Sequence, residues 1–80
     1  MKKITLQYFA VLREQAGCSE EHLETAAATP AELYEQVRTR HGFKLPQSML
    51  RVAVNEEFRD WSWPLQANDR VVFIPPVAGG

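Results

Sequence analysis

The sequence predicts a small α+β domain, in which a mixed sheet of about four to five strands carries one main helix on one face. Three observations lead to this prediction. The chain has 80 residues, which is the size of one domain. Several short segments alternate apolar and polar side chains with the period of a strand. Between them lies one segment with helical spacing and with start and stop signals at its ends.

The first hairpin-like unit is expected in residues 3–25. Residues 3–9 predict a strand whose apolar side chains share one side, namely Ile4, Leu6 and Tyr8. Residues 10–16 predict a short helical turn that ends at Gly17. Residues 21–25 predict a second, weaker strand with Leu23 pointing inward.

The main helix has the clearest local signals in the chain. Thr29 can cap its start, Pro30 suits its first turn, and Glu32 can return a hydrogen bond to the backbone amide of the cap. Gly42 supplies a left-handed stop. Residues that face one side recur between these signals at helical spacing: Leu33, Tyr34, Val37 and His41. The pattern predicts a helix of about three turns.

The second hairpin-like unit and a last strand follow the helix. Residues 49–54 predict a strand, and residues 55–57 predict a turn into a short partner strand at residues 58–59. Residues 64–69 predict a second turn, and residues 70–74 are the most β-prone stretch of the chain. Two hairpin-like units therefore flank one helix, and one face of the sheet is left without a helix.

Composition excludes several classes of function. The formal net charge is -1 with both signs mixed, so the sequence lacks the basic stripe that nucleic acid or an anionic membrane requires. No run of apolar residues is long enough to span a membrane. Cys18 is the single cysteine, and His22 and His41 lack a third ligand at suitable spacing, so no disulfide or bound metal is expected. These features fit a cytoplasmic protein.

An apolar patch is expected on the face of the sheet that the helix leaves open. In the last strand, Val72 and Ile74 point away from the side that carries Val71 and Phe73. Phe9 lies opposite the apolar side of the first strand. If Phe9, Val72 and Ile74 are neighbours there, they form a patch typical of a protein interface. The alternative is that they are ordinary core residues.

The chain ends in the segment "IPPVAGG". Pro75 and Pro76 lock their φ angles and favour an extended path, so the segment points outward from the last strand. Gly79 and Gly80 have no Cβ and can pass through a narrow channel. At about 3.3 Å per residue the segment reaches on the order of 20 Å. We therefore expect a domain at residues 1–74 and a reactive tail at residues 75–80; a frayed terminus is the alternative.

The chain resembles the ubiquitin-like β-grasp sulfur carriers of the MoaD/ThiS type, the family that includes the small subunit of molybdopterin synthase. The likeness spans the whole chain and is strongest in "YFAVLRE" (8–14), "VAVNEE" (52–57) and "PLQANDRVVFIPPVAGG" (64–80). Residues 18–49 match in pattern only. The resemblance implies a ubiquitin-like β-grasp fold.

The resemblance also implies a sulfur carrier for molybdenum cofactor biosynthesis that is not an enzyme on its own. An activating enzyme that uses ATP adenylates the carboxylate of Gly80, beside Gly79, and the carboxylate becomes a thiocarboxylate. The tail then enters the large subunit of molybdopterin synthase, in a heterotetramer, and passes its sulfur to a pyranopterin precursor. The carrier itself binds no cofactor. Contacts with protein partners are expected at Phe9, Arg13, Val72, Ile74, Pro75, Pro76, Val77 and Ala78.

Other interpretations remain open at this point. The chain could be a ubiquitin-like protein modifier, a sulfur carrier for another pathway such as thiamine synthesis, or a noncovalent interaction module. Arg13 could be a solvated arginine at a helix end. Cys18 could carry sulfur as a persulfide, although acidic residues follow it in the sequence. Trp61 and Trp63 alternate like strand residues, so that one packs and the other is exposed.

Overall fold

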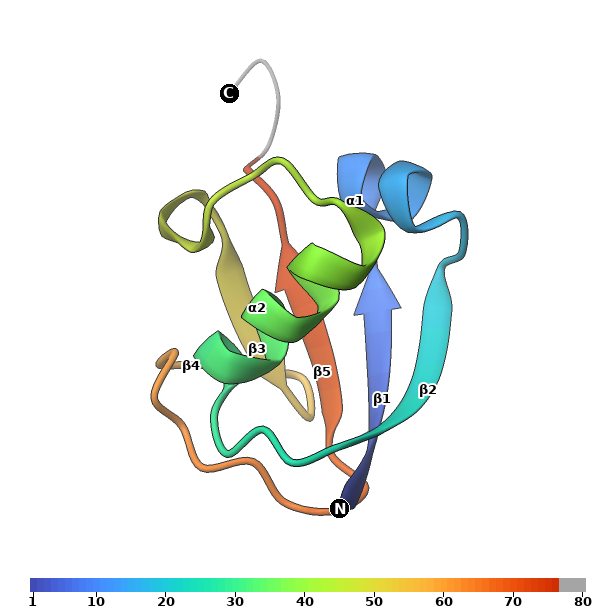
Figure 1. Ribbon diagram of the computed structural model, residues 1–80. Helices are drawn as coiled ribbons and strands as arrows, with labels where there is room; N and C mark the ends of the chain where they lie inside the picture. Colours follow the sequence, from blue (N-terminus) through green and yellow to red (C-terminus); the bar gives the residue numbers. More distant parts are fainter. Residues whose placement is uncertain (77–80) are drawn as a thin grey trace.

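A five-stranded mixed sheet with strand order β2-β1-β5-β3-β4 forms the centre of the computed structural model, which describes residues 1–76 (Figure 1). The elements, in chain order, are β1 Lys2–Tyr8, α1 Ala10–Ala16, β2 Glu20–Thr25, α2 Pro30–His41, the 3₁₀ helix η1 Gln47–Met49, β3 Arg51–Val54, β4 Glu57–Arg59 and β5 Arg70–Ile74. This architecture confirms the predicted α+β class.

The two predicted hairpin units are present, and β5 joins them. β1 pairs with β2 and β3 pairs with β4, both antiparallel. β5 lies between the two units, parallel to β1 and antiparallel to β3. Phe73 of β5 is level with Tyr8 on one side and with Val52 on the other. The last strand of the chain is therefore the middle strand of the sheet.

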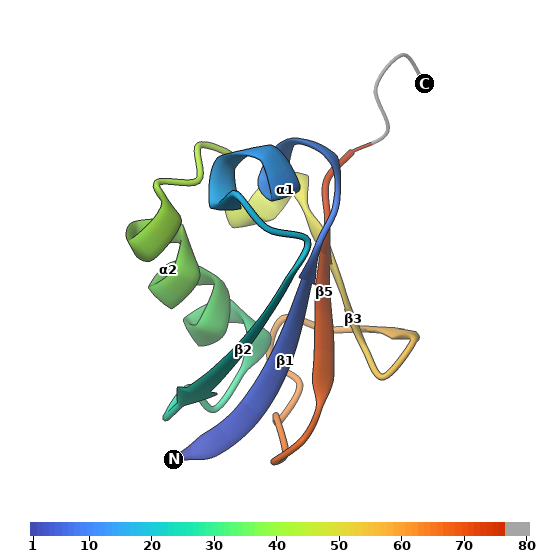
Figure 2. The same cartoon turned by 90° about the vertical axis from the view of Figure 1, so that its right-hand side faces the viewer.

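Both helices cover the same face of the sheet, and the opposite face carries no helix (Figure 2). The core between these layers contains the alternate residues of β1 and β5 together with the inner side of α2: Ile4, Leu6, Tyr8, Leu33, Tyr34, Val37, Val71 and Phe73 are all buried. Neither helix of residues 1–76 is long and apolar enough to cross a membrane.

Helix α2 begins and ends at the predicted residues. The Oγ1 atom of Thr29 accepts a hydrogen bond from the amide of Glu32 at 3.3 Å. Gly42 has φ +71° and its amide donates to the carbonyl of Arg38 at 2.8 Å. The Glu32 carboxylate was predicted to accept a hydrogen bond from the amide of Thr29. It accepts one instead from the amide of Ala28, one residue further back, at 3.5 Å.

Two local predictions are wrong. Phe9 was expected in the first strand, but β1 ends at Tyr8 and the carbonyl of Phe9 accepts the first bond of α1, from the amide of Leu12. Met49 was expected in a strand, but it belongs to η1, where the amide of Leu50 donates to the carbonyl of Gln47. The segment with both tryptophans forms a turn, in which Trp61 packs against the core and Trp63 is exposed, as their alternation predicted.

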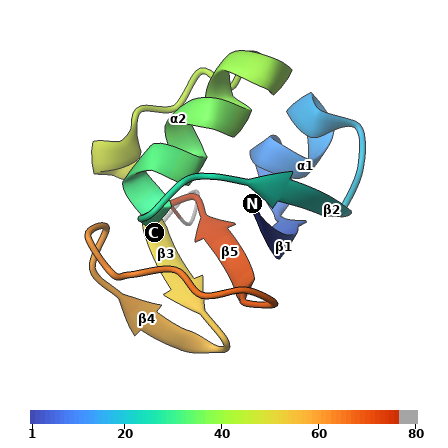
Figure 3. The ribbon, with the colours of Figure 1, turned by 60° about the horizontal axis from the view of Figure 1, so that its bottom comes forward.

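The loop after β4 crosses the end of the sheet that is far from the end of β5 (Figure 3). The amide of Ala31 in the first turn of α2 donates to the carbonyl of Trp61 at 3.1 Å, which ties this loop to the helix. Asp69 is buried, and its carboxylate accepts hydrogen bonds from the side-chain amide of Asn55 and the backbone amide of Gln66. These bonds fix the point at which β5 begins.

Candidate functional site

A surface groove lies at the end of the sheet where the described chain leaves β5. Its volume is about 660 Å³. Figures 1 and 2 show this end of the molecule, where α1 and the end of β5 come together. We call it the tail groove, and it is lined by Phe9, Ala10, Val11, Leu45, Ile74, Pro75 and Pro76.

The parallel pairing of β1 and β5 brings the two strand ends to the same place. Tyr8 is level with Phe73, so the next residues, Phe9 and Ile74, both lie at the end of the sheet. Phe9 is 42% exposed and Ile74 is half-buried. Pro75, which was assigned to the tail, is buried and forms part of the groove wall.

Helix α1 supplies the second wall of the tail groove. Leu12 is fully buried and anchors the helix to the core. Gly17 ends the helix with φ +78°, and its amide donates to the carbonyl of Arg13 at 3.0 Å. Ala10 has φ +52°, a backbone conformation that costs a residue with a Cβ about 1–2 kcal/mol. This turn separates Phe9 from the strand and places it on the groove.

Leu45 reaches the tail groove from a loop that is distant in the sequence. The hydroxyl of Tyr34 in α2 donates to the carbonyl of Leu45 at 2.5 Å. Burial raises the pKa of Tyr34, so this hydroxyl remains a donor at neutral pH. The amide of Lys44 donates to the side-chain oxygen of Gln15 in α1 at 3.3 Å. Both helices therefore hold the loop in position.

The helix-free face of the sheet carries one further predicted contact residue, Val72. Val72 is half-buried and pairs with Gln7 on one side and Ala53 on the other. Ala53 pairs in turn with Phe58 of β4, which is 64% exposed. The structure therefore adds Phe58 to this face. Alternation along each strand of the predicted β3–β4 hairpin is the sequence signal that could have placed Phe58 on this face.

The predicted site residues fall into three groups. The structure brings Phe9, Ile74, Pro75 and Pro76 together in the tail groove. It places Val72 on the adjoining open face and Arg13 on the exposed side of α1. The remaining predicted residues lie outside the described part of the chain: Val77, Ala78, Gly79 and Gly80. Their roles stay predictions.

A half-buried polar cluster joins β1, β2 and α2. The hydroxyl of Tyr8 donates to the Glu21 carboxylate at 2.7 Å, and Nε2 of His41 lies 3.0 Å from the same oxygen. Nη1 of Arg40 lies 3.3 Å from the other oxygen. Burial alone raises the pKa of Glu21, but the hydrogen bonds from His41 and Tyr8 and the charge of Arg40 outweigh it, so the pKa is lowered.

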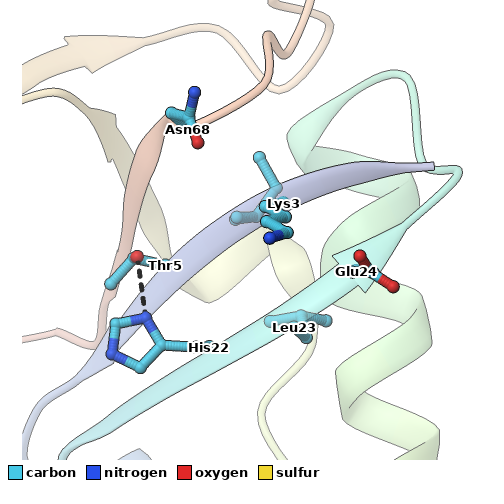
Figure 4. Close-up of a pocket in the computed structure, with 7 residues that line it drawn as sticks. Lys3, Thr5, His22, Leu23, Glu24 and Asn68 are labelled. Carbon is cyan, nitrogen blue, oxygen red and sulfur yellow. Dashed lines mark hydrogen bonds between the residues drawn. The ribbon is translucent and has the colours of Figure 1, made fainter.

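A second, polar pocket lies at the opposite end of β1 and β2 (Figure 4). Its volume is about 470 Å³. Oγ1 of Thr5 and Nδ1 of His22 are 3.1 Å apart across the two strands, and Asn68 faces them from the loop before β5. Among residues 1–76, none of the predicted site residues lines this pocket. No group of three or more metal-ligating side chains occurs in residues 1–76.

The two tryptophans and the cysteine have different environments. Trp61 is half-buried and stacks on Phe73, with ring centroids 5.8 Å apart. Trp63 is 36% exposed, and the guanidinium of Arg59 lies 4.1 Å from its ring centroid. Cys18 is half-buried against the core, with its sulfur free of any disulfide.

The sequence also matches a known family over nearly its whole length. Residues 6–80 match the model of the ThiS family. The chain belongs to the ThiS family. The match covers the end of β1, all later strands, the tail groove and the terminal glycine pair, so the predicted relationship to carriers of the MoaD/ThiS type is confirmed.

Solved structures similar to this ThiS-family chain share its fold. A Pyrococcus furiosus protein assigned as molybdopterin converting factor, subunit 1, is 28% identical, with a TM-score of 0.80 over 96% of this chain and 100% of the other. Small archaeal modifier protein 1 of Haloferax volcanii is 20% identical, with a TM-score of 0.80 over 96% and 100% of the two chains. These likenesses confirm the predicted ubiquitin-like β-grasp fold.

A third similar structure is a protein complex. It contains subunits 1 and 2 of the molybdopterin-converting factor from Helicobacter pylori. The matching chain is 22% identical to the ThiS-family chain, with a TM-score of 0.68 over 98% of this chain and 99% of the other.

Proposed function

We propose that this chain is the sulfur-carrying small subunit of molybdopterin synthase and acts in molybdenum cofactor biosynthesis. The observation that carries the proposal is the ThiS-family match, which extends through the Pro-Pro segment to Gly80. The likeness to the Pyrococcus furiosus converting-factor subunit, at 28% identity, supports this pathway over others. The position of Pro75 and Pro76 at the end of β5 supports a tail that enters a partner.

The proposed chemistry takes place at the carboxyl group of Gly80. A carboxylate resists attack by a sulfur donor because its charge is delocalised and oxide is a poor leaving group. An activating enzyme therefore joins it to AMP from ATP, with release of pyrophosphate, and the sulfur donor then displaces AMP. The product is a thiocarboxylate anion, whose sulfur is a good nucleophile. The chain itself binds neither ATP nor another cofactor.

The second half of the proposed cycle takes place in the large subunit of molybdopterin synthase. The tail enters that subunit, and its sulfur attacks a carbon of the pyranopterin precursor. Water then cleaves the acyl carbon–sulfur bond, so the sulfur stays on the pterin and Gly80 regains its carboxylate. Glycines at 79 and 80 leave the acyl carbon open to attack, since neither carries a Cβ.

Intact mass spectrometry tests the activation step. The full chain is co-expressed with an activating enzyme that uses ATP and with a sulfur source. We expect a gain of about 16 Da, since one oxygen is replaced by sulfur at the activated carboxyl group. A variant with Gly80 deleted serves as the control and should show no gain. An unchanged mass in the full-length chain contradicts the proposal.

A ubiquitin-like modifier is the second candidate, because small archaeal modifier protein 1 has the same TM-score as the converting-factor subunit. Both functions begin with activation of the terminal carboxyl group, so the acceptor distinguishes them. Isopeptide adducts on lysines of other proteins would favour the modifier. Conversion of the pterin precursor by the chain with its large subunit would favour the carrier.

A further inference from the structure

Tyr34 of α2 contacts both segments that meet where the tail leaves the domain. Its hydroxyl donates to the carbonyl of Leu45 at 2.5 Å, and Leu45 lines the tail groove together with Pro75 and Pro76. Its ring packs edge-on against Phe73 of β5, with ring centroids 5.0 Å apart. One side chain of the helix therefore contacts the strand that leads to the tail and the loop that lies beside it.

The position of Tyr34 is fixed by its surroundings. The residue is fully buried. Its ring stacks on Phe43 with centroids 6.1 Å apart, and it meets Trp61 edge-on at 6.0 Å. A ring that is close-packed on several sides has little room to change its rotamer. The hydroxyl is therefore a fixed point to which the loop of Leu45 is attached.

The loop that carries Leu45 has few bonds of its own. Residues 44–46 belong to no helix or strand. Within residues 1–76, two hydrogen bonds join this loop to side chains: the Leu45 carbonyl accepts from Tyr34 at 2.5 Å, and the Lys44 amide donates to Gln15 at 3.3 Å. The bond to Tyr34 is the shorter, and its donor is buried, whereas Gln15 is half-buried. The hydroxyl of Tyr34 is therefore the main restraint on the position of Leu45.

We propose that Tyr34 is a positioning residue for activation of the tail. The inference rests on the proposed function, in which an activating enzyme adenylates the carboxyl group of Gly80. By holding Leu45 beside the two prolines, the hydroxyl of Tyr34 narrows the range of directions in which the chain leaves the groove. A tail with a restricted direction brings its end group into the reactive geometry of another active site more often, and such alignment raises the rate of reaction.

A purely structural role for the hydroxyl predicts a different kinetic result. A destabilised carrier is partly unfolded, so the concentration of folded carrier falls and the apparent KM for the carrier rises, while kcat is unchanged. A folded carrier with a misdirected tail still binds through the rest of its surface, so KM is unchanged. Its kcat falls, because fewer of the bound carriers are aligned for reaction.

Tyr34→Phe tests the proposal, since it keeps the ring and removes only the hydroxyl. Initial rates of pyrophosphate release are measured with an activating enzyme that uses ATP, over a range of carrier concentrations. We expect kcat to fall about five-fold and KM to stay within about two-fold of the value for the unmodified chain.

Leu45→Ala tests the same wall of the groove from the loop. It removes the side chain that the hydroxyl of Tyr34 positions, and it should lower kcat by a similar factor. Adding Tyr34→Phe to Leu45→Ala should then lower kcat by less than about two-fold further, because both changes act through one wall. Effects that multiply in the double variant would contradict this route of action.

Thr25→Val is the matched control. It also removes a buried hydroxyl that bonds to α2, since Oγ1 of Thr25 donates to Gln36 at 2.6 Å, but Thr25 pairs with Lys2 at the opposite end of β1 from the groove. Its kcat should stay within about two-fold of the unmodified value. A kcat for Tyr34→Phe equal to that of the unmodified chain or of this control would overturn the positioning role and leave the proposed function standing. An unmodified chain that releases no pyrophosphate would instead reject the proposed function.

Discussion

Glu21 is a single carboxylate that connects three elements of the fold. It accepts hydrogen bonds from Tyr8 in β1 and from His41 at the end of α2, while its own backbone lies in β2. Its side chain is 15% exposed, so these contacts form mostly out of water. Burial, followed by the hydrogen bond to Glu21 and its charge, raises the pKa of Tyr8, which therefore stays protonated. The sequence contains no local signal for this cluster, since its members are far apart along the chain.

Replacing Glu21 with Gln should lower the free energy of unfolding by about 1–3 kcal/mol at pH 7. The folded-state pKa of Glu21 is depressed, so its contribution is present above the unfolded pKa of about 4.3 and is lost as pH falls through the folded pKa. Urea denaturation of both proteins at pH 7 and at about pH 3 measures this. The difference should shrink at the lower pH. A difference that persists there would show that the charge is not its source.

The same titrations have a matched control in β2. Glu24→Gln changes an exposed carboxylate of the same strand. Its effect on the free energy of unfolding should stay within about 0.5 kcal/mol at both pH values.

Trp61 and Trp63 are expected to contribute very differently to stability. Trp61 packs on Phe73 and Tyr34, so Trp61→Ala should lower the free energy of unfolding by about 2–4 kcal/mol. Trp63 contacts Arg59 at the surface, so Trp63→Ala should cost less than about 1 kcal/mol. Chemical denaturation followed by circular dichroism measures both. Equal losses would contradict the placement of the two rings.

At the scale of elements, α2 could be predicted well because its signals are local. Thr29 and Gly42 each act within one turn of the helix, and the spacing of its apolar residues is set by the helix itself. The strand ends were less predictable. Phe9 and Met49 continue the alternation of their neighbours, but turns that close on nearby carbonyls remove them from the sheet. Alternation alone does not show where such a turn begins.

The cap of α2 gives a prediction at this scale. Thr29→Ala removes the side-chain acceptor for the amide of Glu32 and should lower the free energy of unfolding by about 1 kcal/mol. Thr39→Ala is the control, because Thr39 is exposed in the same helix and does not cap it. Thermal unfolding of the two variants compares them. Similar melting temperatures would argue against a role for the cap.

Across the whole molecule, the core lies on one face of the sheet, whereas the candidate site lies at one end of the sheet and on the adjoining open face. Both helices lie on the face of the sheet that carries the core (Figure 2). Val72 and Phe58, which both pair with Ala53, share the other face, and Ile74 lies at the end of the sheet. The directions of Val72 and Ile74 could be predicted, because alternation along the last strand places both side chains away from Val71 and Phe73. The tail groove as a whole could not be predicted, because Leu45 is held in it by Tyr34, which lies in a distant segment of the chain. The register that separates Val72 from the groove is likewise set by pairing between strands.

This separation predicts that the docking surface can be changed without unfolding the domain. Ile74→Lys adds a charge to the groove and should weaken assembly with the large subunit by about ten-fold or more, because the lysine must be desolvated there. The melting temperature should stay within a few degrees of the unmodified value. Calorimetric titration and thermal unfolding measure the two effects, and unaltered affinity would remove Ile74 from the interface.

The central position of β5 has a mechanical consequence. A pull on the chain at Pro76 acts along this strand, which is hydrogen-bonded to β1 on one side and to β3 on the other. The pulling force is therefore distributed as shear over two rows of backbone hydrogen bonds, and neither row can open one bond at a time. Under the proposed function, the traction of each withdrawal of the tail from its partner falls on the middle strand of the sheet, which is held on both sides.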